Sequence, residues 1–181
     1  MRRIVCVLAM TSVLLAGAAR AEETVEKAVP TAAETTLTAV GQQAPDYTVA
    51  TIDGGTFNLS AQKGRVVLVN WFATWCPPCQ EEMPFLQKDV WEKFAAAGLV
   101  MVSIAREENV AKVKPFVAER GLTWKFAVDP ERLAYARYAE AYIPRNQVIG
   151  RDGTILFQSE GFEKDEFAAM IAVIAAALAA E

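Results

Sequence analysis

Hydrophobic positions along the chain form two kinds of pattern, short continuous runs and longer segments with helical character. Nearly continuous apolar runs of this length are typical of strands buried on both faces of a sheet; they lie at 66–72 and 99–105, and a third strand is predicted at 123–128, where Asp-Pro ends it. Helices are predicted where apolar residues recur at helical spacing or helix formers dominate; these segments are 77–97, 108–120, 131–141 and 164–180. Because strands alternate with helices, we expect an α/β fold with parallel central strands.

Two hairpins are predicted to extend this sheet. Residues 46–59 contain two short strand-like arms around a turn at 53–55, and residues 146–157 contain two more around a turn at 151–153. The second hairpin adds antiparallel strands to the parallel ones. The sequence therefore predicts one central mixed β-sheet flanked by helices.

The beginning of the chain differs from the rest in composition. Arg2 and Arg3 precede an uncharged apolar run at 4–18, and Ala-Arg-Ala at 19–21 fits the cleavage site of a secretory signal. An uncleaved membrane anchor is the alternative, although a spanning helix needs about 20 apolar residues. We therefore expect an exported protein that is soluble after cleavage and membrane-anchored without it. Its predicted parts are a signal peptide at 1–21, a flexible leader at 22–43 and one folded domain at 44–181.

Charge and histidine content exclude several functions. The net charge of the 181-residue chain is −4, so no basic surface indicates nucleic-acid binding. The chain contains no histidine, which excludes Ser-His and Cys-His catalysis and any His-ligated metal. Of the three cysteines, Cys6 lies in the predicted signal, which leaves Cys76 and Cys79. Two thiols are too few for a zinc site, so we expect no metal and no other cofactor.

The chemistry is predicted to lie in the stretch Trp71–Cys79. A buried strand ends there, a helix is expected from Pro77, and the two cysteines stand two residues apart. This order places Cys76 at a helix N-terminus, where unpaired N–H groups and the helix dipole favour the reactive thiolate. Cys79 lies one turn further along and can close a disulfide with it. The pattern indicates a thiol–disulfide oxidoreductase, with Cys76 exposed and attacking and Cys79 buried and resolving.

From about residue 41 to 180 the chain resembles thioredoxin-fold proteins, and more narrowly the exported thiol–disulfide oxidoreductases of the TlpA/ResA type. The resemblance is carried by the first hairpin, the Trp71–Cys79 stretch, Glu82 to Pro84, and Ile143-Pro144. The helix and strand at 108–128 resemble the central insertion of that family. The resemblance implies a thioredoxin-like domain with an N-terminal β-hairpin and a central αβ insertion.

The resemblance also implies that the Ile143-Pro144 peptide bond is cis and faces the cysteines. The backbone of Ile143 would then be free to pair with an extended substrate segment. The candidate substrate-binding residues are Trp75, Pro77, Pro78, Ile143 and Pro144. Residues 145–147, Arg-Asn-Gln, depart from the small and aromatic residues usual in the family, which puts substrate choice in doubt at that place.

A proton-transfer residue is predicted at Glu82. Thioredoxin carries a buried aspartate where this chain has Asn70, so another acid must serve. Glu82 stands three residues after Cys79, on the same face of the helix, whereas Glu81 should point to solvent. Burial would raise the pKa of Glu82 and let it exchange a proton with Cys79. Pro84 should kink the helix and free a carbonyl nearby. A solvated surface glutamate is the alternative.

The leading functional hypothesis is a periplasmic enzyme that reduces disulfides in exported proteins and is re-reduced by a membrane thiol electron donor. By resemblance, its candidate substrates are apocytochrome c and metal-site assembly proteins, which connects it to cytochrome c biogenesis. Three alternatives stay open. They are an oxidant or isomerase of the same fold, a thiol peroxidase, and a Cu(I)-binding module that uses the two thiolates.

Overall fold

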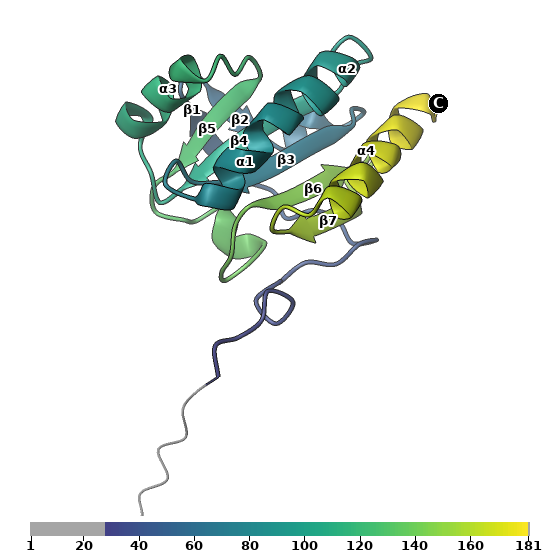
Figure 1. The fold of residues 1–181 in the computed structure, drawn as a ribbon. Helices are drawn as coiled ribbons and strands as arrows, with labels where there is room; N and C mark the ends of the chain where they lie inside the picture. The colour runs from purple at the N-terminus through teal and green to yellow at the C-terminus, as the bar shows by residue number, and fades with distance from the viewer. Residues whose placement is uncertain (1–27, 181) are drawn as a thin grey trace, which may run out of the picture.

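One mixed sheet of seven strands forms the centre of the protein in this computed structural model, which describes residues 28–180 (Figure 1). The strand order is β2-β1-β5-β4-β3-β6-β7. The strands are β1 (Thr48–Thr51), β2 (Thr56–Asn58), β3 (Val67–Phe72), β4 (Val100–Arg106), β5 (Lys125–Asp129), β6 (Arg145–Ile149) and β7 (Ile155–Glu160). The expected signal peptide lies outside the described residues.

The pairing within the sheet confirms the predicted thioredoxin-like architecture. The central strands β3, β4 and β5 are parallel, as expected for strands joined through helices. The N-terminal hairpin β1-β2 joins β5 antiparallel, and the late hairpin β6-β7 joins β3 antiparallel. All six residues of β3 are buried. The strand that leads into the cysteines is therefore held by neighbours on both edges and both faces.

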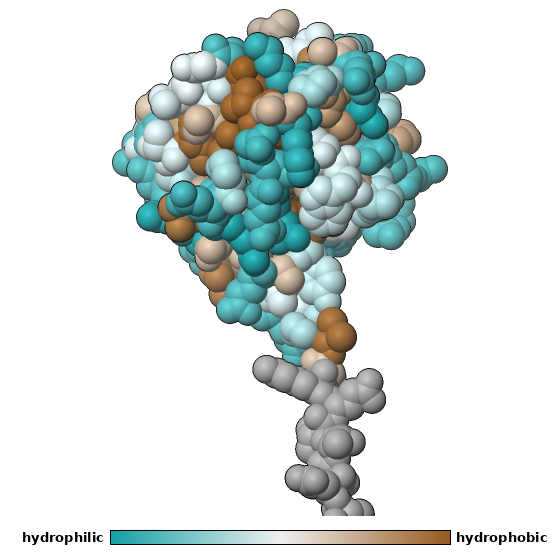
Figure 2. All heavy atoms as spheres, turned by 90° about the vertical axis from the view of Figure 1, so that its left-hand side faces the viewer, coloured by the Kyte–Doolittle hydropathy of each residue, from teal (hydrophilic) through white to brown (hydrophobic). Residues whose placement is uncertain are grey.

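The long helices cover one face of the sheet (Figure 1). They are α1 (Pro77–Phe85), which continues through a π-helical segment (Leu86–Trp91) into α2 (Glu92–Phe94), α3 (Val110–Glu119) and α4 (Lys164–Ala179). Their apolar sides meet the sheet in a single core. Within residues 28–180, no helix combines the length and the apolar character that crossing a bilayer requires. Figure 2 shows the α3 side of the molecule, where hydrophilic surface is interrupted by smaller hydrophobic patches.

Pro84 changes the type of helix rather than ending it. Proline has no N–H to donate, so the carbonyl of Gln80 loses its usual helical partner. α1 continues to Phe85, and the hydrogen bonding becomes π-helical from Leu86 to Trp91. Such π segments are a known way to accommodate an irregularity inside a helix. The helical run expected from Pro77 is thus continuous to Phe94.

The opposite face of the sheet carries a second, largely aromatic core. Trp71 packs there against Tyr47, Tyr135 and Tyr138, with ring centroids 5.3–5.6 Å apart. The helix predicted over 131–141 to cover this face is wrong: the segment contains only a 3₁₀ turn at Tyr135–Arg137. The buried side chain of Asp129 accepts the N–H groups of Ala134 and Tyr135, which satisfies them without a longer helix.

The leader expected to be flexible packs against this second face from Thr31 onward. Glu140 donates its N–H to the carbonyl of Thr35, and Leu37 donates to the carbonyl of Tyr138. Thr35 is 1% exposed. Isolated β-bridges join Thr36 to Ala139 and Gln43 to Thr154. Residues 31–43 therefore form a strap that is hydrogen-bonded to the domain. The composition of this segment had predicted a free tether.

Candidate active site

The two cysteines form a disulfide at the N-terminus of α1. Cys76 occupies the N-cap position with extended backbone, and its Sγ accepts the N–H of Cys79 at 3.3 Å. The predicted position of Cys76 at a helix start is therefore confirmed. Pro77 and Pro78 have no N–H, so the donor to this sulfur is the N–H of Cys79, and together with the helix dipole it favours negative charge on the sulfur.

The two cysteines are less different in exposure than the sequence predicts. Cys79 is 0% exposed, as expected for a resolving thiol, but Cys76 is only 3% exposed. The expectation of an exposed Cys76 is wrong for this oxidised state. Its Sγ lies 3.7 Å from the carbonyl oxygen of Ile143, and the bonded sulfur has no proton to donate to that oxygen. The loop before β6 thus shields the disulfide.

The predicted substrate-binding residues lie around this disulfide. Trp75 is 59% exposed, and Pro77 and Pro78 are exposed beside it, so they form an apolar rim next to Cys76. The Ile143-Pro144 peptide bond is cis, as the resemblance implied. Within residues 28–180, the N–H of Ile143 has no hydrogen-bond partner. A backbone group left unpaired beside the sulfur suits recognition of an extended peptide. Pro144 itself is buried and presents no side chain to a substrate.

Glu82 lies inside the protein on the helix that carries both cysteines. It is 0% exposed, and its two carboxylate oxygens accept one amide N–H each. Asn70 donates to Oε2 at 3.0 Å, and Asn146 donates to Oε1 at 2.6 Å. Burial raises the pKa of Glu82 to about 8, and the two amide hydrogen bonds oppose that shift. The surface alternative for Glu82 is therefore excluded, and its carboxyl group can hold a proton near neutral pH.

Glu108 is a second buried carboxylate next to the cysteine loop, and the sequence analysis missed it. It is 3% exposed and accepts both the N–H and the hydroxyl of Thr74 at 2.6 Å. The carbonyl of Thr74 in turn accepts the side-chain amide of Gln80 at 2.6 Å. These bonds fix the loop two residues before Cys76. The position of Glu108 in the sequence could have indicated this role. Glu108 follows β4, and the carboxyl ends of neighbouring parallel strands, here β3 and β4, meet at one edge of the sheet.

The three unusual residues after Pro144 do not form a substrate surface. Arg145, Asn146 and Gln147 are each 1% exposed. Asn146 binds Glu82, and Gln147 accepts the indole N–H of Trp71 at 2.7 Å. The departure from the family at these positions therefore concerns the interior of the protein.

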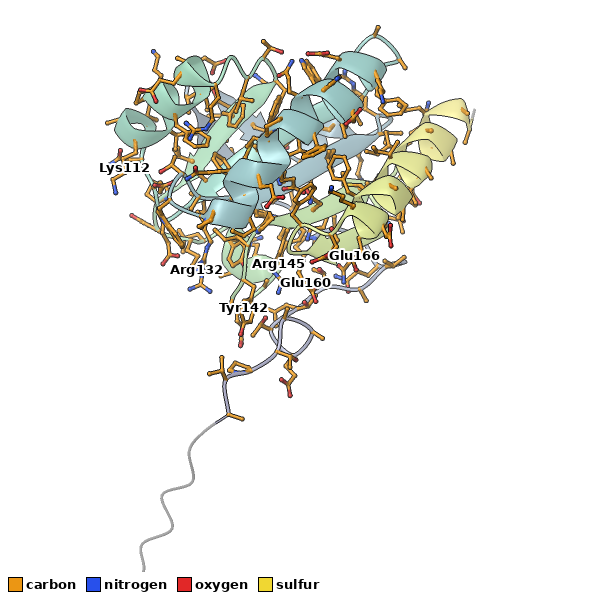
Figure 3. The ribbon with its side chains drawn as sticks, in the orientation of Figure 1. Lys112, Arg132, Tyr142, Arg145, Glu160 and Glu166 are labelled. Carbon is orange, nitrogen blue, oxygen red and sulfur yellow. A yellow bond between two sulfur atoms is a disulfide. The ribbon has the colours of Figure 1, made fainter. Side chains whose placement is uncertain are left out.

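Arg145 joins the loop before β6 to the strap. Its guanidinium ion-pairs with Glu160 at 3.6 Å, and Tyr142 donates its hydroxyl to the carbonyl of Pro30. Figure 3 shows these three labelled side chains together at the edge that the N-terminal segment crosses. The other acceptors of Arg145 are the carbonyls of Ala32, Ala141 and Tyr142 and the hydroxyls of Thr35 and Thr36.

A disulfide at a helix start, facing a cis-proline loop of a thioredoxin-like sheet, is the arrangement of a thiol–disulfide oxidoreductase. The chain belongs to the redoxin family, whose model matches residues 39–178. It is a thiol–disulfide oxidoreductase of the thioredoxin-like, ResA type.

Known proteins similar to this chain agree with that class. The chain is 29% identical over 127 residues to the thiol-disulfide oxidoreductase ResA of Bacillus thuringiensis, covering 70% of this chain and 73% of the relative. It is 34% identical over 118 residues to the thioredoxin-like protein YneN of Bacillus subtilis, covering 64% and 68%. A solution structure of a candidate protein disulfide isomerase from Bacteroides thetaiotaomicron superposes with a TM-score of 0.76 at 35% identity, covering 80% of this chain and 92% of that one.

Proposed function

We propose that the protein is an exported protein-disulfide reductase that works through the Cys76-Pro77-Pro78-Cys79 dithiol. The observation that carries this proposal is the placement of Cys76. Its sulfur accepts an N–H at the start of α1 and lies beside the unpaired backbone of Ile143. A thiolate held there can attack a disulfide in a peptide that pairs with that backbone.

Reduction of a substrate disulfide takes two exchange steps from the reduced enzyme. The Cys76 thiolate attacks one substrate sulfur, so that a mixed disulfide forms and the first substrate thiolate leaves and takes up a proton. Cys79 then loses its proton and attacks the sulfur of Cys76, which releases the second substrate thiolate. Two electrons pass to the substrate, and the enzyme ends with the Cys76–Cys79 disulfide seen here.

Glu82 is the proton acceptor for Cys79 in the second step. The two side chains are three residues apart on one buried helix face. A pKa of about 8 leaves Glu82 mostly protonated at pH 7, so the Cys79 proton passes to the ionised minority of Glu82, and this transfer is nearly balanced because that pKa lies close to that of a thiol. Whenever Glu82 is ionised, its negative charge also opposes early ionisation of Cys79, so the resolving thiol stays protonated until the mixed disulfide forms.

Export and the partners of the reaction belong to the same proposal. The apolar run at 4–18 with its preceding arginines supports secretion to the periplasm or another extracytoplasmic space. A membrane thiol electron donor would return the disulfide to the dithiol state. Disulfide-containing exported proteins are the proposed substrates, among them apocytochrome c and metal-site assembly proteins.

A trapping experiment tests the attacking role of Cys76. Without Cys79 the mixed disulfide cannot be resolved, so Cys79→Ala should retain substrate proteins on Cys76 in the exporting cell. Cys76→Ala is the matched control and should retain none. The proposal fails if Cys76→Ala forms the mixed disulfides and Cys79→Ala does not.

The direction of exchange is tested separately, because the name of the Bacteroides structure points to isomerisation. A reductase should reduce insulin with a thiol donor and show little reactivation of scrambled ribonuclease. Efficient reactivation of ribonuclease with slow insulin reduction would instead establish the isomerase alternative.

A further inference from the structure

A chain of hydrogen bonds runs through the core from Trp124 to Glu82. The indole Nε1 of Trp124 donates to Ser103 Oγ at 2.9 Å, and Ser103 donates to Asn70 Oδ1 at 2.9 Å. Asn70 Nδ2 then donates to Glu82 Oε2 at 3.0 Å. All four side chains are buried, and they come from α1, β3, β4 and the residue before β5.

A second path closes the network from β6. Asn70 Nδ2 also donates to Asn146 Oδ1 at 2.9 Å, which uses both protons of that amide. Asn146 Nδ2 donates to Glu82 Oε1 at 2.6 Å. Each oxygen of Glu82 therefore faces an N–H group.

The direction of every bond in this network follows from its Trp124 end. An indole N–H can only donate, so Ser103 must accept from Trp124 and pass its single proton to Asn70. That bond fixes the oxygen of Asn70 toward Ser103 and its NH₂ toward Glu82 and Asn146. Asn146 must then accept with its oxygen and donate with its NH₂.

We infer that Trp124 and Ser103 are positioning residues, which hold the Asn70 and Asn146 amides with their NH₂ groups toward Glu82. This inference rests on the proposed role of Glu82 in proton transfer. It means that two residues remote from the cysteines control the proton affinity of Glu82. Two N–H donors favour the ionised carboxylate and counteract burial. If the Ser103 hydroxyl is lost, Asn70 can turn over and present its oxygen to Glu82, which favours the protonated acid.

Neighbouring charged groups do not set the pKa of Glu82. Its titratable neighbours on α1 are Cys79 and the exposed Glu81. Asn70, Ser103 and Asn146 face it from the sheet and are neutral. The adjacent Arg145 on β6 points to the opposite face, where it binds the strap and Glu160. Burial raises the pKa of Glu82, and the hydrogen bonds from the Asn146 and Asn70 amides lower it.

Direct titration of Glu82 tests the inference. Carboxyl-labelled glutamate in the oxidised protein allows the Glu82 midpoint to be followed by NMR while the cysteines cannot titrate. Ser103→Ala should raise the midpoint by about one pH unit, a tenfold change in proton affinity. Trp124→Phe should raise it less, because Ser103 still reaches Asn70.

Trp91→Phe is the matched control, since Trp91 is partly buried in the same core outside the network. It should leave the midpoint unchanged. Folded Ser103→Ala and Trp124→Phe variants with unchanged or lowered midpoints would overturn the inference. A raised midpoint together with an unchanged rate of mixed-disulfide resolution would support the inference and refute the proton role of Glu82.

Discussion

The role of the Glu82 carboxyl group can be tested against the preceding residue, Glu81, which serves as the control. Glu81 is exposed, whereas Glu82 is fully buried behind the cysteines. Glu82→Gln should slow resolution of the mixed disulfide by about 10²-fold near pH 7, because Cys79 loses its proton acceptor. Rapid-mixing kinetics of mixed-disulfide decay across pH measure this rate. The same kinetics for Glu81→Gln should match the parent; equal behaviour of the two variants would exclude Glu82 from the mechanism.

A second residue-level prediction concerns Glu108. Removing its carboxylate leaves the N–H and hydroxyl of Thr74 without their partner beside the cysteine loop. Glu108→Ala should lower the free energy of unfolding of the oxidised protein by about 1–3 kcal/mol, measured by chemical denaturation. The control is Glu107→Ala, since Glu107 makes only a partly exposed ion pair with Arg106. Equal losses in the two variants would contradict this role of Glu108.

The spacing of residues in the sequence was enough to predict the part of the site that lies on one helix. Cys76, Cys79 and Glu82 lie on one short helix, so their common face can be read from the sequence. Glu108 and Asn146 reach the site from β4 and β6, and their contacts depend on pairing between strands distant in sequence. A single sequence carries no signal for such a pairing beyond the position of a polar residue at a strand end.

At the level of elements, Arg145 holds the strap against the loop that faces the cysteines. Arg145→Met keeps the volume of the side chain but removes an ion pair and several hydrogen bonds from a buried place. We expect a loss of about 3 kcal/mol in unfolding free energy and faster amide hydrogen exchange at 31–43. Hydrogen exchange read by mass spectrometry checks the strap directly.

The control for this prediction is Arg151→Met. Arg151 donates to carbonyls at the end of α4, but these bonds are exposed, so its loss should cost little. If Arg145→Met leaves the exchange of residues 31–43 at the parental rate, Arg145 does not hold the strap.

The elements divide into those that follow from local pattern and those that do not. The parallel unit and both hairpins were predicted correctly, because their apolar runs and turns are local features. The helix predicted over 131–141 failed because Arg132 has a positive φ of 61°, a left-handed backbone conformation that a right-handed helix cannot contain. The strap was missed because its partners, such as Tyr138 and Arg145, lie about a hundred residues away.

Across the whole molecule, β3 separates the proton site from the aromatic core. Adjacent residues of a strand face opposite sides, so Asn70 points toward α1 and Trp71 points toward the tyrosines. Both sides are closed, one by helices and the other by the strap and the 130–141 segment. This enclosure keeps water from Glu82 and is the reason that its pKa rises.

The raised pKa of Glu82 predicts how the stability of the whole protein depends on pH. The folded state keeps the Glu82 proton up to about pH 8, whereas the unfolded chain releases it near the ordinary value of 4.5. Between these values the folded state binds more protons, so stability falls as pH rises. In the oxidised protein, the unfolding free energy of the parent relative to Glu82→Gln should decrease by up to about 1.4 kcal/mol per pH unit. The difference should be constant below about pH 4 and again above about pH 9. Denaturant unfolding of both proteins from pH 4 to 9 measures it, and parallel curves would show that Glu82 ionises normally in the folded state.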